Sequence, residues 1–551
     1  MKKTIQFKNF CLILSLYFSS VINLPFWKEF FSLSGGVHFS DSYSYVSVFL
    51  IFTVGFFVIF HTLLFKYLTK IVSLLLIFTS AIASYALSRF KVHFSSIIVR
   101  SLFESDQLEL RAFISSDLLI DLFFFVLLPS VLVVLIRIEY PSLVRLMINK
   151  IRVLVFAPFL IALIYLSNQL LLNTLVDKAE ARHLKAMIIP FNVAKGVREY
   201  LNERPKSLSL GFGLQPPATP AAYPGSQTYP PIVNSKGRKV LFVFVLGESA
   251  RASSFSLNGY HRETNPKLRK IRNLLSYSQF YACGTATAIS VPCMFSSLGR
   301  EGFDHKKVDE QENLLQTARR NGIDVKWFDN GMGGQRVVKD GIQEISLGNY
   351  YEADLDSVLT QHLPTRDELI RENHHRFIVL HQRGSHGPDY WKRYSREFAI
   401  FTPDCSSGSL SRSCTRDEIV NAYDNTIIYT DKNLSDTIAK LEQLSDIYDT
   451  ALLYVSDHGE STGEFGVYMH GLPYSIAPED QIRIPFIVWF SDSFIKRRGL
   501  DLNCLDKNKA NKYSHDNIYS SVLSLFDVGS ISSQYQSKTD LFDSCITRSA
   551  K

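Results

Sequence analysis

Apolar residues are spread very unevenly along this chain of 551 residues, and no other feature restricts its architecture as much. Residues 1–173 consist of almost continuous apolar runs, whereas the remaining residues have an ordinary globular composition. Long apolar runs are typical of helices that cross a bilayer. We therefore predict a transmembrane domain at residues 1–173 and a soluble domain at residues 239–551, joined by residues 174–238.

Crossing a bilayer takes about 20 residues of apolar helix, and five segments approach or exceed that length. They lie at roughly 10–27, 44–65, 71–88, 118–136 and 153–172. A cleaved signal peptide is the alternative for the first segment, but no small-residue cleavage site precedes Pro25. We predict a five-helix transmembrane domain.

Basic residues gather in alternate connections between these segments. With five spans, nine of them lie on one side of the membrane: Lys2, Lys3, Lys8, Lys66, Lys70, Arg137, Arg145, Lys150 and Arg152. The positive-inside rule makes that side cytoplasmic and places residues 174–551 outside the cytoplasm. The net charge of +7 then belongs largely to this basic collar, and the absence of a basic stripe interleaved with aromatic residues argues against nucleic-acid binding.

Two connecting segments follow the last span. Residues 177–204 alternate charged and apolar positions at helical spacing, which indicates either an amphipathic bridging segment at the membrane surface or an ordinary exposed helix. Residues 205–237 contain seven prolines and predict a semi-extended linker.

Short apolar runs alternate with helical patterns from residue 239 onward. We expect strands at 239–246, 324–328, 376–381, 451–456 and 485–490. Residues 311–321 and 417–444 have helical periodicity. The alternation predicts an α/β domain built on a doubly wound sheet.

Six of the seven cysteines lie in the predicted soluble domain, and an even number outside the cytoplasm indicates disulfides. Cys283 and Cys293 are close in sequence, as are Cys405 and Cys414, and each pair would close a local loop. Cys504 and Cys545 pair by elimination. The alternative is a cysteine zinc site, which the absence of any Cys-x-x-Cys disfavours. Cys11 lies in the first span and is expected to be an inert buried thiol.

Metal-binding residue types stand where two of these strands end. Glu248 follows one apolar run, and Asp457 and His458 follow another. Open α/β sheets place their sites at the carboxyl ends of strands, and this set of side chains is typical of zinc. The alternatives are a carboxylate at a helix N-terminus for Glu248 and a hydrogen-bonded pair for Asp457 and His458. We expect Gly459 to permit the turn that brings the last two together.

A hydroxyl nucleophile lies in the segment CGTATAISVPC at 283–293. Thr287 needs activation, which zinc would provide by lowering the pKa of a bound oxygen. Alternatively, Thr285 and Thr287 cap a helix.

Two further histidines, His386 and His470, stand in glycine-flanked loops and could hold a second metal ion or a substrate phosphate. Residues 327–336 form a glycine-rich loop that could line a phosphate site through Arg336. The other histidines are interpreted as structural: His261, His305, His362, His374, His375, His381 and His515.

Taken together, the motifs resemble those of the lipid A phosphoethanolamine transferases, a family that includes the mobile colistin-resistance enzymes. They are GESAR at 247–251, NGYHRETNP at 258–266, CGTATAISVPCMFS at 283–296, GSHGP at 384–388 and SDHGES at 456–461. The likeness covers the whole chain and implies a soluble domain of the alkaline phosphatase/sulfatase superfamily.

This resemblance implies specific roles. Zinc (one ion or two) would be held by Glu248, Thr287, Asp457 and His458, with Thr287 as nucleophile and with His386 and His470 around a second metal or the substrate phosphate. A lipid head group would meet Ser101, Ser105, Glu109 and Arg336. The family often has Asn and Thr at the first two of these positions and a Lys near the fourth, and a further disulfide of some members has no cysteines here.

The hypothesis is a two-step transfer. Thr287 attacks phosphatidylethanolamine, diacylglycerol leaves, and a lipid A phosphate takes the phosphoethanolamine group. The chain would act as a monomer in the bacterial inner membrane, with its catalytic domain in the periplasm, and would confer polymyxin resistance. The alternatives are transfer to Kdo, a core sugar or another glycan, a glycerol-phosphate transferase, a phosphate or sulfate hydrolase, and a membrane-tethered binding protein with a degenerate site.

Overall fold

The computed structural model describes residues 4–33, 42–90, 99, 116–175, 184–203, 237–339, 341–348, 355–406, 414–464, 467–472, 474, 477–528, 532 and 534–547. These residues divide into two compact units, one ending at Asn202 and the other beginning at Glu203.

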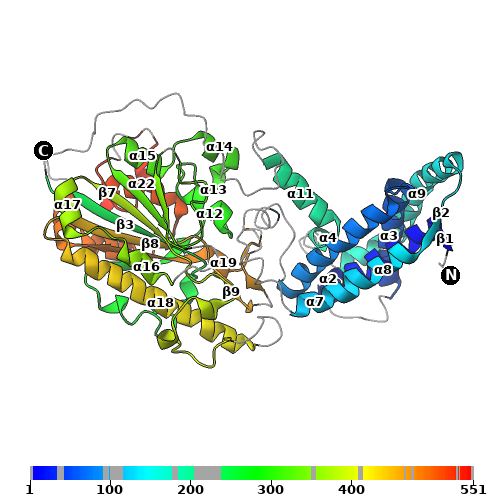
Figure 1. The fold of residues 1–551 in the computed structure, drawn as a ribbon, viewed down its shortest axis with the longest axis horizontal. Coiled ribbons are helices and arrows are strands. Elements are labelled where there is room, and N and C mark those ends of the chain that lie inside the picture. The colour runs from blue at the N-terminus through cyan, green and yellow to red at the C-terminus, as the bar shows by residue number, and fades with distance from the viewer. Residues whose placement is uncertain are drawn as a thin grey trace. The chain divides into compact units, whose positions relative to one another are not determined.

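The first unit is built from helices, which Figure 1 shows in blue to cyan. They are α1 (Phe7–Tyr17), the π-helix η1 (Phe18–Ile22), α2 (Leu24–Leu33), α3 (Ser42–Leu63), α4 (Thr69–Phe90), α7 (Ser116–Leu122), the π-helix η3 (Phe123–Leu127), α8 (Leu128–Leu135), α9 (Leu143–Leu175) and α11 (Phe191–Glu203). Two short strands, β1 (Thr4–Gln6) and β2 (Arg137–Glu139), pair in parallel.

The described residues contain fewer spanning helices than the five predicted. Three are long and apolar enough to cross a membrane: Tyr45–Leu63, Thr69–Ser88 and Leu143–Leu166. The first predicted span is instead a pair of helices bent by 53°, and counting that pair as one span raises the total to four. The bend falls between Ile22 and Leu24, and Pro25, which has no N–H to donate, is the second residue of α2. The fourth predicted span is a shorter apolar helix, Leu119–Leu135, which is about 26 Å long at 1.5 Å per residue.

An amphipathic helix lies within the predicted bridging segment. In α11 the apolar side chains Phe191, Val197 and Leu201 are exposed, as are Lys195 and Glu199, which form an ion pair. Whether this helix lies on a membrane stays a prediction, and the predicted linker at 205–237 falls almost entirely outside the described residues.

The second unit is organised around a sheet of eight strands in the order β12-β4-β11-β8-β3-β7-β5-β6. Strand β11 runs antiparallel to both β4 and β8, and the remaining neighbours are parallel. The strand bounds are β3 (Val240–Gly247), β4 (Leu274–Tyr281), β5 (Asp324–Asp329), β6 (Gln343–Ser346), β7 (Arg376–His381), β8 (Asp449–Ser456), β11 (Arg483–Phe490) and β12 (Tyr513–Ser514).

All five predicted strands belong to this sheet. They correspond to β3, β5, β7, β8 and β11. Strands β3, β7, β8 and β11 are almost entirely buried, as expected of central strands, whereas β5 (DVKWFD) also contains charged residues and is partly exposed at two positions. The pattern analysis missed β4, β6 and β12. In β4 polar and apolar residues are mixed, β6 is largely exposed, and β12 has only two residues, so none of them shows an apolar run.

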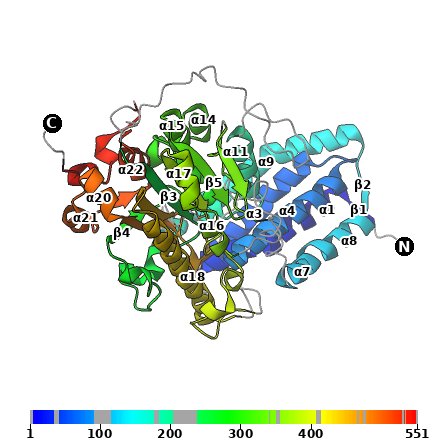
Figure 2. The same ribbon diagram turned by 60° about the vertical axis from the view of Figure 1, so that its left-hand side comes forward.

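Helices cover both faces of the sheet. In Figure 1, and again after the rotation in Figure 2, α18 (Arg416–Gln443) crosses one face, while α15 (Leu314–Arg320) and α22 (Ile518–Leu525) lie on the other. The remaining helices of this unit include α12 (Thr287–Met294), α14 (His305–Glu310), α16 (Ser357–Gln361), α17 (Arg366–Glu372), α19 (Glu479–Ile482), α20 (Asp492–Arg498) and α21 (Leu502–Asn508).

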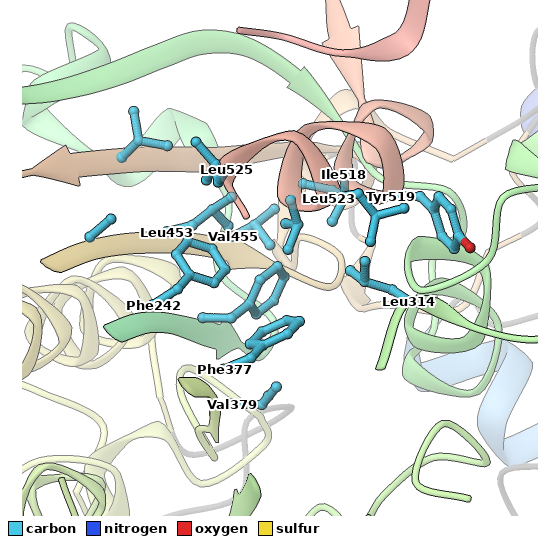
Figure 3. Packing of buried hydrophobic residues seen from close by; sticks show 14 of the residues in the cluster. Phe242, Leu314, Phe377, Val379, Leu453, Val455, Ile518, Tyr519, Leu523 and Leu525 are labelled. Atoms are coloured by element: carbon cyan, nitrogen blue, oxygen red, sulfur yellow. The ribbon is translucent and has the colours of Figure 1, made fainter. Parts of the chain in front are cut away.

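Alternate residues of each central strand feed two separate apolar cores. Phe242 and Phe244 point into the core shared with α15 and α22, where Figure 3 shows Phe242 and Phe377 beneath the side chains of α22. Leu241 and Val243 point into the core shared with α16, α17 and α18. This is the doubly wound arrangement that the sequence predicts.

The cysteines pair as predicted. Disulfides join Cys283 to Cys293, Cys405 to Cys414 and Cys504 to Cys545, and Cys11 is a buried free thiol.

Candidate active site

Three predicted metal ligands meet at the carboxyl edge of the sheet. Glu248 directly follows β3, and Asp457 and His458 directly follow β8, its parallel neighbour. All three side chains are fully buried, and their ligand atoms lie within 4.8 Å of one another. Burying two carboxylates together is costly unless positive charge accompanies them.

The backbone around these residues is shaped to aim them inward. Ser249 has a φ of 56°, which is rare for a residue with a Cβ, and its N–H donates to Asp457 Oδ1 at 3.1 Å. Gly459 was expected to permit a turn, but the reason for glycine is space. A Cβ there would meet the carbonyl oxygen of Asp480 at 2.0 Å.

The ring of His458 has a defined tautomer. Its Nδ1 donates to the carbonyl of Gly459 at 3.0 Å, so in the neutral ring Nε2 carries a lone pair. Nε2 lies 3.2 Å from Thr287 Oγ1, 3.4 Å from Glu248 Oε1 and 3.2 Å from Asp457 Oδ2. Among the described residues that buried Oδ2 accepts no hydrogen bond. A nitrogen lone pair crowded by oxygens fits a cation at their centre, and this donor set fits zinc.

The pKa directions agree with that fit. Burial raises the pKa of Glu248 well above its usual value, and the charge of Asp457 raises it further. Burial lowers the pKa of His458 to about 4, so its ring is neutral at physiological pH, as a metal ligand must be.

Thr287 is the first residue of α12 and, unlike the three ligands, is partly exposed. Its Oγ1 donates to Glu248 Oε2 at 3.1 Å. The helix N-cap is Ala286 and no side chain caps it, so neither Thr285 nor Thr287 has the capping role considered as an alternative. A hydroxyl at a helix N-terminus is well placed to carry negative charge.

Thr285 holds the nucleophile segment to the loop that carries His470. Its Oγ1 donates to the carbonyl of Leu472 at 2.6 Å, and its carbonyl accepts the N–H of Gly471 at 2.8 Å. Both links are buried, so the segment around Thr287 and the loop after β10 (Tyr468–Met469) are held together.

The two loop histidines lie beside the ligand group. The ring of His470 is centred 4.2 Å from that of His458 and 5.5 Å from that of His386. Nδ1 of His470 donates to Oε2 of the fully buried Glu460 at 2.7 Å, and Tyr390 donates to Oε1 at 2.7 Å. The sequence analysis gave Glu460 no role, although its place within Asp-His-Gly-Glu offered the signal.

His515, which the sequence analysis interpreted as structural, holds two segments of the site together through hydrogen bonds. Its Nδ1 accepts the N–H of Cys283 at 3.0 Å, and its Nε2 donates to the carbonyl of Ser456 at 3.0 Å. Burial lowers the pKa of His515 to about 4, so the ring stays neutral. It thereby ties the nucleophile segment to the end of β8. The sequence gave no indication of this role, because His515 lies far along the chain from both Cys283 and Ser456.

The loop after β5 is tied to neighbouring elements. Arg336 forms an ion pair with Asp309 of α14, and Nδ1 of His381, at the end of β7, lies 3.0 Å from Asp329 Oδ1 and donates to the carbonyl of Gly333 at 3.1 Å. The other predicted head-group residues lie outside the described residues: Ser101, Ser105 and Glu109.

Comparison with known proteins assigns the family. Residues 241–528 match the sulfatase family model, and residues 52–204 match the model described as phosphoethanolamine transferase EptA/EptB. The phosphatidylethanolamine transferase Mcr-1 of Escherichia coli is 31% identical over 93% of this chain and 94% of its own length. The chain belongs to the phosphoethanolamine transferases.

Two other members of this family are similar to this chain. Phosphoethanolamine transferase EptA of E. coli K12 is 40% identical over 57% of this chain, but that alignment spans only 58% of EptA. The integral membrane lipooligosaccharide phosphoethanolamine transferase A of Neisseria meningitidis is 28% identical, with a TM-score of 0.88 over 99% of this chain and all of that one. This phosphoethanolamine transferase is thus a multi-pass membrane protein with a soluble domain of the sulfatase superfamily.

Proposed function

We propose that the enzyme transfers phosphoethanolamine from phosphatidylethanolamine to a phosphate of lipid A through a covalent intermediate on Thr287. One observation carries the proposal: a partly exposed hydroxyl lies 3.1 Å from a buried Glu248 carboxylate and 3.2 Å from the unprotonated nitrogen of His458. The names of the relatives Mcr-1 and EptA support the transferred group and donor class.

Glu248, Asp457, His458 and Thr287 would hold one zinc ion, and His386 and His470 would hold a second ion or the substrate phosphate. When bound, zinc supplies positive charge that lowers the pKa of a nearby hydroxyl and offsets charge on the phosphoryl group.

In the first half-reaction Thr287 loses its proton and its Oγ1 attacks phosphorus. The Oγ1–P bond forms as the bond from phosphorus to the glycerol oxygen breaks, and diacylglycerol leaves with a proton. In the second half-reaction an oxygen of a lipid A phosphate attacks the same phosphorus and Oγ1 departs. Two displacements replace one difficult transfer between two lipids.

His470 is the best-placed residue to exchange the proton with the leaving oxygen. Its Nδ1 donates to buried Glu460, which fixes the orientation of the ring. His386 lies beside it and would contact the phosphoryl oxygens.

The membrane unit would hold the site at the lipid surface, where both substrates reside. We propose that the bent helix pair and the short helix Leu119–Leu135 both cross, making five spans and placing the catalytic unit in the periplasm, outside the inner membrane. The added ammonium lowers the net negative charge of lipid A, which would weaken binding of polymyxins.

Head-group contacts by Ser101, Ser105 and Glu109 remain part of the proposal. A phosphate contact by Arg336 requires that its guanidinium exchange the carboxylate of Asp309 for the substrate.

Intact-mass spectrometry of the enzyme incubated with phosphatidylethanolamine tests the intermediate. The wild type and Thr287→Ser, which keeps a hydroxyl, should gain one phosphoethanolamine, and Thr287→Ala should gain none. An adduct of equal yield in Thr287→Ala would reject this nucleophile.

Mass spectrometry of lipid A from cells with and without the enzyme tests the acceptor. A gain of one phosphoethanolamine on a lipid A phosphate is expected. A gain on Kdo or a core sugar would change the acceptor, and turnover of phosphatidylethanolamine without any acceptor would identify a hydrolase.

A further inference from the structure

The catalytic unit exposes very few large apolar side chains. Among the described residues from 237 onward only three are exposed: Ile370 at 58%, Trp391 at 37% and Ile400 at 59%. Two of these three fall within the single segment of residues 390–400. Trp391 is also the one exposed tryptophan of the chain's four, since Trp27, Trp327 and Trp489 are all buried.

The segment of residues 390–400, called here the Trp391 segment, packs against α18. Next to its end, the N–H and carbonyl of Phe401 exchange hydrogen bonds with the Asn425 side chain at 2.8 and 3.0 Å. The ring of Phe398 lies edge-on to Tyr429 at 5.1 Å. The exposed side chains therefore project from an ordered support, and their exposure does not arise from a loose loop.

The Trp391 segment is also tied directly to the candidate active site. At its start Tyr390 donates to Glu460, the partner of His470, at 2.7 Å. Arg393 Nε donates to the carbonyl of His386 at 2.9 Å. Whatever surface the Trp391 segment contacts therefore lies close to the site.

The side chains of the Trp391 segment match the chemistry of the polar–apolar boundary of a bilayer. A tryptophan and an isoleucine are exposed together with Lys392, whose Nζ lies 5.3 Å from the Trp391 ring. Residues 390–400 contain three basic side chains and one acidic one, and Lys392 also forms an ion pair with the preceding Asp389 at 2.6 Å. Tryptophan prefers the head-group level of a membrane, basic side chains reach toward anionic head groups, and aliphatic side chains enter the acyl region.

We propose that the Trp391 segment is a bilayer contact of the catalytic unit, in which Trp391 and Ile400 enter the lipid head-group region of an anionic membrane. The contact presents the carboxyl edge of the sheet to the lipid surface, where an amphiphilic substrate need not leave the bilayer to reach Thr287. This proposal rests on the chain being embedded in a membrane and on the fold of the catalytic unit. It does not depend on which group the enzyme transfers.

Tryptophan fluorescence of the full chain in nanodiscs of phosphatidylethanolamine and phosphatidylglycerol tests the contact. Subtracting the emission of Trp391→Phe from that of the wild type isolates Trp391 and leaves the three buried tryptophans unchanged. We expect lipids brominated near the head group to quench this component more than lipids brominated deep in the acyl chains, and acrylamide in the water to quench it weakly. Strong quenching by acrylamide with no quenching by brominated lipids would overturn the proposal and favour a protein partner for the surface.

Ile370 provides a matched control. It is as exposed as Ile400, but it lies on α17, which leads into the amino end of β7 and thus lies at the opposite edge of the sheet. Ile400→Ser should reduce lipid quenching of Trp391, and Ile370→Ser should leave it unchanged. Equal effects of the two substitutions, or none from Ile400→Ser, would contradict the bilayer contact. Because the readout is fluorescence, it is informative even if the chain transfers a different group.

Discussion

Two groups of two carboxylates and one histidine lie at opposite edges of the same sheet, and their surroundings differ. At the carboxyl edge Glu248, Asp457 and His458 are fully buried, and none of the described lysines or arginines forms an ion pair with the two carboxylates. The amino-edge group contains Asp324, Glu372 and His374.

The amino-edge group is partly exposed and already carries a positive partner. Its side chains are 32%, 35% and 41% exposed for Asp324, Glu372 and His374. Arg376 forms an ion pair with Glu372 and lies 3.9 Å from Asp324. Water and an arginine therefore satisfy these carboxylates, whereas the carboxyl-edge group has neither. The same residue types indicate a metal site only where burial leaves their charge uncompensated.

The sharpest test of this difference removes one carboxylate from each edge. Asp457→Asn should lower zinc from about one equivalent per chain to almost none and reduce transfer by about 10³-fold or more, because a ligand is lost. Asp324→Asn should change neither quantity. Metal analysis of the purified proteins and an assay with a fluorescent phosphatidylethanolamine measure both. Loss of zinc in Asp324→Asn would remove the distinction.

A smaller effect is expected from the residue that orients His470. Glu460→Gln keeps a hydrogen-bond acceptor for His470 but removes the buried charge, and transfer should fall about 10- to 100-fold, as for other partners of ligand-side histidines. The matched change at the amino edge is Glu372→Gln, which should have no effect on kcat. Zinc content and kcat should be measured together. Full activity of Glu460→Gln would show that the carboxylate charge has no part in the chemistry.

The smallest effect concerns stability and pH. Because the folded pKa of His515 is about 4, below its unfolded value near 6.5, the unfolded chain takes up a proton between these values and the native chain does not. Stability should therefore fall as the pH drops through this window, by roughly 2 kcal/mol from His515 alone between pH 6.5 and pH 5.

Urea unfolding at several pH values, followed through the buried Trp327 and Trp489, measures that slope. His515→Gln should flatten it, and His374→Gln, at a partly exposed position, should not. Equal slopes in the wild type and His515→Gln would show that His515 is already charged in the native protein.

The sequence singled out Glu248, Asp457 and His458, which the structure brings together, because they follow apolar runs. Glu248 and Asp457 each come after a buried strand, and parallel neighbours end at one edge. The residues that support the site, such as His515 and Thr285, follow no apolar run that would mark them. His515 and Thr285 act through backbone groups of distant segments, and a hydrogen bond to a backbone leaves no pattern in the residues that receive it.

For the membrane unit, the sequence was less accurate about structure. Apolar composition located the membrane region but overestimated the number of helices of spanning length, since composition does not report a bend after Ile22 or the short length of Leu119–Leu135. Likewise, the run of mixed residues in β4 became a strand only because β11 and β12 pair with it.

By itself the sequence determined which segments are apolar enough to be strands or spans, and which residue types stand at strand ends. Those properties depend on composition and short-range spacing. Only the tertiary structure decided that Thr287 meets Glu248, 39 positions away, and His458, 171 positions away. That meeting depends on β3 and β8 being neighbours and on α12 beginning beside their ends, and such long-range pairing is selected by the packing of the whole sheet.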